Sequence, residues 1–412
     1  MTKLQHLIDT LCPHGVPFKP LAEIGTFIRG NGLQKKDFTD SGVGCIHYGQ
    51  IYTHYGTFAS KPISFVSEET ANNCRKAMPG DLVIAATSEN VDDVCKCVAW
   101  LGDEEVAISS DAFVFRHNLN PKYVAYYFQS DCFQKQKLPF VTGTKVMRVS
   151  SENLAKIIIP IPPMPVQEEI VRILDRFADY SAQLQAELQA ELQARKAQYE
   201  FYRNHLLAFN DDQIPFKPLG EVFELRNGYT PSKNNPEFWE GGTIPWFRME
   251  DIRENGRILS DAIQHITPAA IKGKGLFEAN SFILATTATI GEHALLIADS
   301  LANQRFTNLK VRKSLANLLK TKFIYYYMFI VDEFCKNNTN VSGFASVDMD
   351  KLKRMPIPIP PIPVQEKIVA ILDRFEALVN DLCCGLPAEI EAVNARYEFY
   401  RNHLLSFTPL SL

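Results

Sequence analysis

Hydrogen-bond donors gather beside glycine in short stretches of both halves of the chain. "RGNGLQKK" starts at Arg29, "TGTKVMR" at Thr142 and "RNGYTPSK" at Arg226. Glycine lets a backbone approach a ligand closely, and Lys, Arg, Asn and Gln bind phosphate oxygens and the edges of bases. The chemistry that these stretches offer is recognition of a nucleic acid by hydrogen bonding. For any single residue, a solvated loop is the alternative.

The candidate contacts fall into several groups in each half of the chain. In the first half they are Arg29, Asn31, Lys35, Lys36, Tyr48, Gln50, Tyr52, Thr142, Thr144, Lys145 and Arg148. In the second half they are Arg226, Asn227, Thr230, Ser232, Lys233, Arg248, Asn340 and Ser342. We predict that the groups together, more than any one residue, form the contact surface.

Motifs for catalysis and for metal binding are not found. "NPEFW" at 235–239 has Glu where an adenine methyltransferase motif needs its second Pro, and there is no phosphate-binding "GxxxxGK[ST]" loop. Cys45, His47 and His54 lack the partner spacing of a zinc site. We therefore expect no catalytic residue, no metal and no cofactor on this chain. The nine cysteines without a framework and the absence of a signal peptide predict a cytoplasmic protein with reduced thiols.

A repeat organises the elements that must position these groups. "IPIPPMPVQEEIVRILDRF" at 159–177 returns as "IPIPPIPVQEKIVAILDRF" at 357–375, with sixteen of nineteen letters unchanged. "YEFYRNHLL" at 199–207 returns unchanged at 397–405. Both pairs are 198 residues apart, so the chain consists of two tandem units. Two large copies in one chain predict a pseudo-dimer with a pseudo-two-fold axis.

Each unit contains an α+β domain, a stiff proline passage and a long helix. No Gly or Pro occurs from Val166 to Phe209, which predicts one continuous helix. In the second copy "CCGLPAEI" predicts a break, because Gly ends helices and Pro begins them. The predicted segments are a first domain at 1–160, a first spacer helix at 161–210, a second domain at 211–358 and a second spacer helix at 359–412 that is broken near Gly385–Pro387.

An apolar seam with heptad spacing follows both helical segments. It steps by four residues at "QAELQAEL" (185–192), which is the pattern of a coiled-coil stutter. The seam positions at this step are Leu184, Leu188 and Leu192 in the first copy and Leu382, Leu386 and Ile390 in the second. A narrow seam predicts that the two helices pack on each other, and a two-fold relation makes them antiparallel. The alternative is that each helix packs only on its own domain.

Two different domains on a paired-helix spacer favour duplex DNA as the partner, since duplex DNA has two-fold axes perpendicular to its own axis. The charge of the chain qualifies this prediction. The net charge is −4, and the two helical segments carry 9 basic and 14 acidic residues, so the rest sums to about +1. Non-specific DNA affinity comes mostly from neutralised phosphates. Much of that affinity is therefore expected to come from partner subunits.

The repeated passages resemble the conserved regions of type I restriction–modification specificity subunits. The resemblance rests on the proline-to-helix passage, "GLPAEI" and "YEFYRNHLL". "GYTPSKNNPEFWEGGTIPWFRMEDI" (228–252) and "GNGLQKKDF" followed by "GCIHYGQIYTHYG" (44–56) are similar to openings of that family's target recognition domains. The resemblance covers nearly the whole chain.

The resemblance implies an α+β fold with two globular target recognition domains in tandem repeat, joined by two long antiparallel coiled-coil helices. Each domain would read half of a bipartite site in double-stranded DNA, while the helices set the gap and dock two modification subunits. Those subunits would carry S-adenosylmethionine, and restriction subunits would supply chemistry driven by ATP and Mg. The host would be bacterial or archaeal, and no membrane is implied. The alternative function is a coiled-coil scaffold that bridges proteins without reading DNA.

Overall fold

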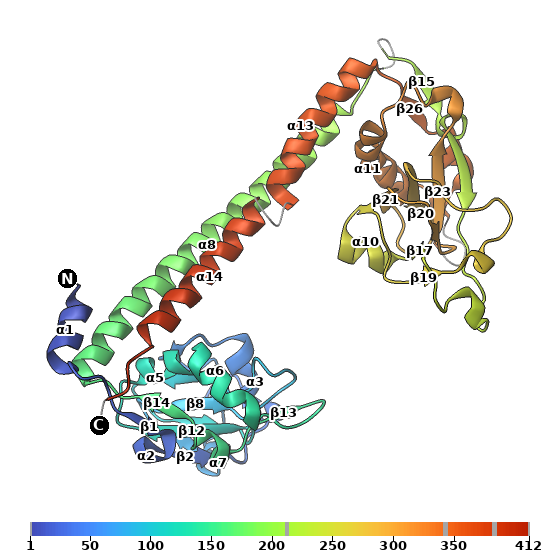
Figure 1. Cartoon of the computed structure of the whole chain (residues 1–412). Helices are drawn as coiled ribbons and strands as arrows, with labels where there is room; N and C mark the ends of the chain where they lie inside the picture. Colours follow the sequence, from blue (N-terminus) through green and yellow to red (C-terminus); the bar gives the residue numbers. More distant parts are fainter. Residues whose placement is uncertain (1, 211–213, 341–344, 381–384, 411–412) are drawn as a thin grey trace. The chain divides into compact units, whose positions relative to one another are not determined.

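The computed structural model describes residues 2–210, 214–340, 345–380 and 385–410. The chain forms two compact units, Met1–Leu188 with Ile390–Leu412 and Gln189–Glu389. Each unit holds one α+β domain together with parts of the long helices (Figure 1). No described helix has both the length and the apolarity needed to cross a bilayer.

The main sheet of the first domain is built around β8 (Leu82–Ala85). All four of its side chains are buried, and an unbroken apolar run is what a strand covered on both faces requires. The strand order is β2 (Gly25–Arg29), β12 (Ala112–His117), β8, β10 (Cys97–Trp100) and β5 (Phe58–Ala59). A second sheet has the order β3 (Phe38–Thr39), β6 (Ser64–Val66), β4 (Val43–Ile46), β11 (Val106–Ile108) and β7 (Lys76–Ala77).

The second domain repeats this architecture with different residues. Its central strand β20 (Ser281–Ala285) is also buried along its whole length. The main sheet has the order β16 (Phe223–Asn227), β23 (Phe306–Val311), β20, β21 (His293–Leu296) and β18 (Ile258–Leu259). The second sheet has the order β19 (His265–Ile266), β17 (Ile244–Phe247) and β22 (Leu301–Ala302). The fold is therefore duplicated even where the sequence is not.

A helical layer covers the main sheet of each domain. In the second domain it is the uninterrupted α11 (Thr321–Asn337). In the first domain the sequence predicts one helix over 121–136, and this was wrong: α5 (Pro121–Phe128) ends before Ser130, whose hydroxyl caps α6 (Asp131–Lys137). An aromatic stripe at helical spacing predicts core residues, and the tyrosines of these helices are buried, at 1% exposure for Tyr126 and 0% for Tyr326.

The two proline passages are edge strands. β14 (Ile158–Pro160) pairs antiparallel with β1 (Phe18–Pro20), and β26 (Pro356–Pro358) pairs with β15 (Phe216–Pro218). Proline removes a backbone donor and fixes an extended backbone, so a two-stranded edge ribbon accommodates it. Each passage thereby ties the end of its domain back to the beginning of that domain.

The long helices begin directly after these passages. α8 runs without interruption from Met164 to Leu206, whereas the second copy holds α13 (Ile362–Asn380) and α14 (Leu386–Leu404). The predicted break near Gly385–Pro387 falls partly on residues 381–384, which lie outside the described residues, as does the seam position Leu382. Of the other seam positions, Leu192 and Leu386 are buried, and Leu184, Leu188 and Ile390 are half-buried.

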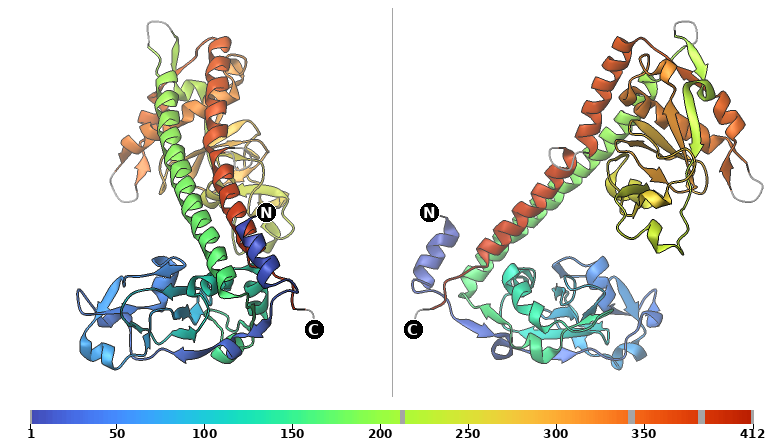
Figure 2. Two further views of the ribbon diagram at one scale, coloured as in Figure 1. Left: turned by 90° about the vertical axis from the view of Figure 1, so that its left-hand side faces the viewer. Right: turned by 45° about the vertical axis from the view of Figure 1, so that its right-hand side comes forward.

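The helices pack antiparallel within each unit. In the first unit α8 and α14 lie side by side (Figure 2). Phe177 stacks on Tyr400 at 5.1 Å between ring centroids, and the Gln185 amide donates to Asn394. The position along α8 rises as the position along α14 falls, which confirms the predicted direction. In the second unit Tyr202 of α8 stacks on Phe375 of α13 at 5.6 Å.

The beginnings of these helices also enter the domain cores. Ile170 and Leu174 of α8 are fully buried in the core of the first domain, and Ile368 and Leu372 of α13 lie in that of the second. The structure therefore combines the two packing modes that the sequence leaves open. Each helix is anchored in its own domain and also packs on another helix.

Short elements complete the domains. In the first domain they are α1 (Lys3–Leu11), α2 (Leu21–Ile24), α3 (Tyr48–Thr53), α4 (Glu68–Asn72), α7 (Ser151–Leu154), β9 (Thr87–Ser88) and β13 (Met147–Arg148). In the second they are α9 (Leu219–Val222), α10 (Met249–Asn255), α12 (Met349–Arg354), β24 (Thr339–Asn340) and β25 (Ser346–Val347).

Candidate nucleic-acid interface

Two of the predicted donor groups of the first domain lie side by side. The ring of Phe38, two residues after Lys36, lies edge-on to the His47 ring at 5.9 Å between centroids, so the stretch that begins at Arg29 approaches α3. Burial lowers the pKa of His47, and the nearby charge of Lys35 lowers it further. The His47 ring lies 4.6 Å from that of Tyr48, which in turn lies 6.4 Å from that of Tyr52. An aromatic and cationic surface therefore runs from Lys35 along α3.

The third group joins the same surface through β9. The Tyr52 hydroxyl donates to the carbonyl oxygen of Thr87, and Thr87 pairs with Arg148 in the β9–β13 ladder. Burial raises the pKa of Tyr52, so this phenol stays a donor. The structure thus brings together three stretches that are separate in sequence.

A hairpin carries the most exposed candidates. The backbones of Thr142 and Arg148 exchange hydrogen bonds of 2.9 and 2.8 Å, and Thr144 and Lys145 lie exposed between them. Gly143 allows the turn, because its φ is +110° and a Cβ there would lie 2.0 Å from the carbonyl oxygen of Val146. The hairpin presents Thr142, Thr144, Lys145 and Arg148 to solvent.

Other predicted side chains of the first domain are engaged inside it. Asn31 donates to the carbonyl of Asn73 at 3.0 Å and accepts from the backbone N–H of Arg75 at 2.7 Å. Gln50 is buried, accepts from the backbone N–H of His47 and donates to Ser64 at 2.7 Å. These two side chains stabilise loops, whereas Arg29, Lys35 and Lys36 remain exposed.

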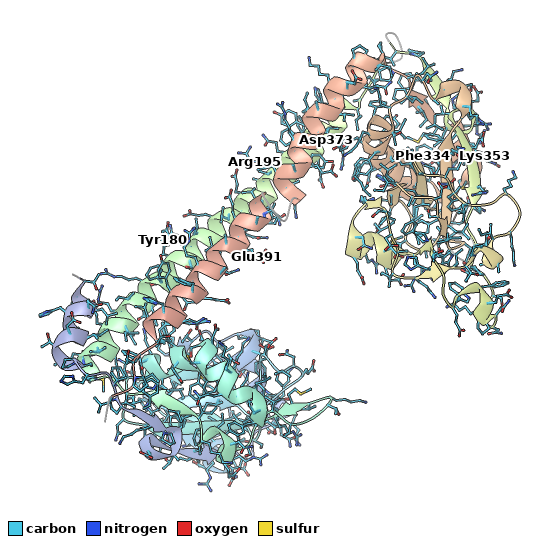
Figure 3. All side chains as sticks on the ribbon, in the orientation of Figure 1. Tyr180, Arg195, Phe334, Lys353, Asp373 and Glu391 are labelled. Atoms are coloured by element: carbon cyan, nitrogen blue, oxygen red, sulfur yellow. The ribbon has the colours of Figure 1, made fainter. Side chains whose placement is uncertain are left out.

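The second domain presents a cleft of about 570 Å³ with no acidic residue in its lining. It is lined by Leu225, Arg226, Asn227, Thr286, Thr287, Gln304, Thr307, Ser346, Val347, Met349 and Lys353. The sequence prediction included Arg226 and Asn227 but missed the three threonines, Gln304 and Lys353. Of these, Figure 3 labels Lys353. The run "TTAT" directly after the β20 strand is the signal that could have found two of them.

Neutral hydrogen-bonding groups in and beside this cleft form two separate hydrogen-bonded sets. The Thr307 hydroxyl donates to Asn227 at 3.0 Å and lies 3.1 Å from the Thr286 hydroxyl. The Thr230 hydroxyl donates to the side-chain oxygen of Gln304 at 2.5 Å. Both amides accept with their oxygens, so their NH₂ groups remain as donors. Asn and Gln amides are groups that proteins use to read base edges.

Arg226 is held at the edge of this cleft. Its guanidinium donates to the carbonyl of Lys274 at 2.9 Å and lies 4.6 Å from the ring centroid of Phe277. Burial lowers its pKa from the ordinary arginine value. Stacking and hydrogen bonding together restrict the Arg226 side chain to one conformation, so the direction of its guanidinium group is fixed.

The remaining predicted residues are dispersed over the second domain. Arg248 precedes α10, where its backbone N–H donates to Asp251 at 2.6 Å, and its Nε is buried without a hydrogen-bond partner. Ser232 and Lys233 are exposed. Asn340 pairs with Ser346 in the β24–β25 ladder, and the prediction for Ser342 lies outside the described residues.

The two domains place equivalent backbones at their candidate surfaces. In the first domain the stretch 142–148 pairs with β9, which follows the central strand β8. In the second domain Ser346 forms a bridge with Thr287, which follows the central strand β20. Among the residues that the structure describes, no three His, Cys, Asp or Glu side chains gather as metal ligands would.

Exposed aromatic side chains recur on the helices. Phe201 is 65% exposed and Phe399, its repeat counterpart, is 63% exposed. Each stacks parallel to a histidine one turn later, His205 at 6.0 Å and His403 at 6.2 Å. Single exposed apolar side chains are ordinary on a protein surface, so it is their recurrence in the repeated stretch that makes these two candidates for an interaction surface. Tyr180, at 64% exposure, is another such side chain on α8 (Figure 3).

The sequence matches the model of a known family twice. The family is described as the type I restriction modification DNA specificity domain, and its model matches residues 13–194 and 212–392. Because these matches take in most of the chain, this chain belongs to that family. The family prediction made from the repeated passages is confirmed.

Curated relatives are specificity subunits. The EcoprrI specificity subunit of Escherichia coli is 50% identical over 202 residues, which cover 47% of this chain and 50% of that protein. The EcoR124I/EcoR124II specificity subunit of Escherichia coli is 38% identical over 273 residues, or 63% and 65% of the two chains. A putative specificity subunit of Haemophilus influenzae is 31% identical over 71% of this chain and 74% of that protein. The chain thus spans about half to two thirds of the length of the first two relatives.

Two solved structures share the fold. One is a chain from a structural study of complex assembly and conformational transition of the type I R-M system. It aligns with a TM-score of 0.72 at 18% identity, over 95% of this chain and 97% of that one. The HsdS subunit of Thermoanaerobacter tengcongensis aligns with a TM-score of 0.59 at 18% identity, over 96% of each chain. The predicted α+β tandem architecture is confirmed.

Proposed function

We propose that this chain is the DNA sequence-specificity subunit of a type I restriction–modification complex. Each target recognition domain reads one half of a bipartite site in double-stranded DNA, and the paired helices set the gap between the halves. The observation that carries the proposal is one fold used twice with different polar surfaces. A bridging scaffold does not need two different heads, whereas a reader of two unlike half-sites does.

The chemistry of the two surfaces supports this reading. The first domain combines the exposed cations and threonine hydroxyls of the 142–148 hairpin with the aromatic and cationic surface from Lys35 along α3. The second combines Arg226, Lys353 and neutral amides and hydroxyls in a cleft without acidic lining. Cations suit phosphates, and amides and hydroxyls suit base edges. Both surfaces therefore offer donors of the two kinds that sequence recognition uses.

The duplicated aromatic groups on the helices support docking of two copies of one partner. Phe201 and Phe399 are exposed to nearly the same extent, and each belongs to the unchanged "YEFYRNHLL" stretch. Contact with water alone does not explain why an exposed phenylalanine occurs at both positions. We assign these two surfaces to two modification subunits, with restriction subunits joining the same complex.

The chain itself is proposed to be non-catalytic and to act in the cytoplasm. S-adenosylmethionine would be bound by the modification subunits, and ATP and Mg by the restriction subunits. The sequence motifs that bind these cofactors are not found in this chain. Its role would be to place the methyl-transferring partners on an adenine in each half-site.

The test compares the purified chain with the assembled complex. Alone, the chain should bind DNA weakly and transfer no methyl group, since much of the phosphate neutralisation would come from partners. With its modification subunits it should methylate a bipartite site, which methylome sequencing of a strain carrying the complex identifies. Methyl transfer by the highly purified chain, or a complex that methylates without sequence preference, would refute the proposal.

A further inference from the structure

The duplicated proline-to-helix passage contains a pair of residues that reach back into the adjacent domain. Gln167 is 2% exposed, and its side-chain oxygen accepts from the backbone N–H of Asn120 at 2.9 Å, directly before α5. Its amide donates to the carbonyl of Pro162 at 2.7 Å. One buried side chain therefore joins the start of α8, the proline passage and the start of α5.

The second copy repeats this contact. Gln365 is 0% exposed and accepts from the backbone N–H of Lys320 at 2.8 Å, directly before α11. Its amide donates to the carbonyls of Pro360 and Leu318, both at 2.7 Å. Buried amides with all these partners satisfied hold a fixed geometry, because each lost bond would leave a buried polar group unpaired.

An aspartate eight residues later makes the second contact. Asp175 accepts from Lys122 at 2.7 Å and from the Tyr126 hydroxyl at 2.8 Å, both on α5. Asp373, which Figure 3 labels, accepts from Lys322 at 3.0 Å and from the Tyr326 hydroxyl, both on α11. The glutamine and the aspartate are a little over two helical turns apart. Two fixed points on each long helix therefore restrict the pivoting of the domain.

We call the contacts of Gln167 and Asp175 with their domain the first joint, and those of Gln365 and Asp373 the second joint. The second joint has an additional contact that the first lacks. Glu376 accepts from Tyr325 at 2.9 Å and from Tyr326 at 2.8 Å. Aligning Asp175 with Asp373 places Ala178 at the position of Glu376, and aligning Tyr126 with Tyr326 places Ala125 at the position of Tyr325. Neither alanine side chain offers such a hydrogen bond. The two joints are thus built alike but restrained to different extents.

We infer that Gln167, Asp175 and their counterparts Gln365 and Asp373 are positioning residues that fix each recognition domain on its spacer helix, and that they set the gap of the bipartite site without reading its bases. This inference rests on the proposed function. It also explains why the passage is nearly unchanged between the copies while the surfaces that would read DNA differ. The joint sets a geometry that both halves need, whatever bases each one reads.

The experiment is methylome sequencing of strains that carry the complete complex with one substitution in this chain. The variants are Asp175→Asn, Asp373→Asn and Tyr126→Phe, and Glu168→Gln is the control on an exposed neighbour of Gln167. We expect Asp175→Asn to raise methylation at sites whose gap is one base pair longer or shorter by about tenfold, as expected for loss of a charge-assisted hydrogen bond. The half-site bases should stay the same.

Asp373→Asn should have a smaller effect than Asp175→Asn, because Glu376 still holds Tyr325 and Tyr326. Tyr126→Phe removes one hydroxyl from a well-packed ring, so it tests the joint without endangering the fold. It should broaden the gap less than Asp175→Asn, because Lys122 still pairs with the aspartate. Glu168→Gln should match the unaltered chain.

Several outcomes would overturn the inference. One is an unchanged gap distribution in both Asp175→Asn and Tyr126→Phe with normal methylation. Altered half-site bases are another, since they would make the joint part of the reading surface. Loss of methylation in Asp175→Asn with an unchanged gap in Tyr126→Phe would show a role in stability alone. In all three cases the unaltered complex still methylates a bipartite site, so the proposed function stands. If the unaltered complex does not, the proposed function itself fails.

Discussion

At the scale of single residues, the first domain separates groups that hold loops from groups that face solvent. Asn31 and Gln50 have the right chemistry for DNA contact but are engaged in hydrogen bonds inside the domain. Lys145 and Arg148 are exposed on a hairpin whose backbone is fixed by its own ladder. A rigid backbone with exposed cations is the better candidate, because little order is lost on binding.

Replacing Lys145 or Arg148 by Ala should weaken DNA binding by the complex and leave assembly intact. A lost base contact costs about 1–3 kcal/mol and relaxes one position, whereas a lost phosphate contact lowers the salt slope by about one. Titration of labelled DNA at several salt concentrations distinguishes the two. Lys61→Ala, an exposed lysine in the β5–β6 loop, is the control. Unaltered affinity in both variants would show that the DNA-contacting surface lies elsewhere.

In the second domain, Gln304→Ala should relax one position of one half-site by about 1–3 kcal/mol, since its amide is the kind of group that reads base edges. The other half-site should be unaffected. Methylome sequencing measures both halves in the same cells, so the first half serves as the internal control. Relaxation of both halves, or of neither, would argue against a reading role for the cleft.

At the scale of elements, the repeat "QAELQAEL" within α8 is the feature with a quantitative consequence. It is part of an uninterrupted helix, and its seam positions Leu184, Leu188 and Leu192 are half-buried or buried. One added unit of four residues lengthens a helix by roughly 6 Å and turns it by roughly 400°, a net 40° or so. The seam therefore nearly keeps its direction, and the helix pairing should survive.

A third "QAEL" unit should lengthen the unspecified gap by one base pair and leave both half-sites unchanged. One base pair adds roughly 3.4 Å along DNA and about 36° of turn, so the rotation matches better than the rise. Part of the shift must then be absorbed by the partner helices near Gly385–Pro387. Methylome sequencing of strains with one, two and three units is the measurement. An unchanged gap with three units, or altered half-site bases, would refute the hypothesis that the length of α8 sets the gap.

At the scale of the whole molecule, the chain is one architecture built twice from diverging domains and nearly constant connections. The main sheets have the same strand order, and the joints between domain and helix use the same residue pairs. Such an arrangement allows one domain to change without disturbing the other, because the cores are separate.

Exchanging residues 16–160 for the first domain of another family member should change one half-site and preserve the other half-site and the gap. The boundaries fall where the chain enters β1 and leaves β14, so the edge ribbon is transferred as a unit. Methylome sequencing of the hybrid provides the test, and the parent strain provides the control. A change in both halves would contradict the separation of the two readers.

The sequence alone determined the repeat, the long helices and the family, because these depend on local patterns. Prolines, a heptad seam and identical passages fix helix and connector wherever they occur. The tandem α+β fold could be predicted for the same reason. The helix predicted over 121–136 failed, because capping by Ser130 divides it and a periodic pattern does not reveal that interruption.

The tertiary structure alone decided which donors meet. The Tyr52–Thr87–Arg148 connection joins residues that are far apart in sequence, and the cleft in the second domain gathers Asn227, Thr286 and Gln304 from three different segments. Strand pairing and core packing bring such residues together, and both depend on contacts between distant parts of the chain. The spacing of residues along the sequence carries no record of those contacts. The sequence therefore identified the family, and the tertiary packing determined which polar residues lie together and exposed at the candidate surfaces.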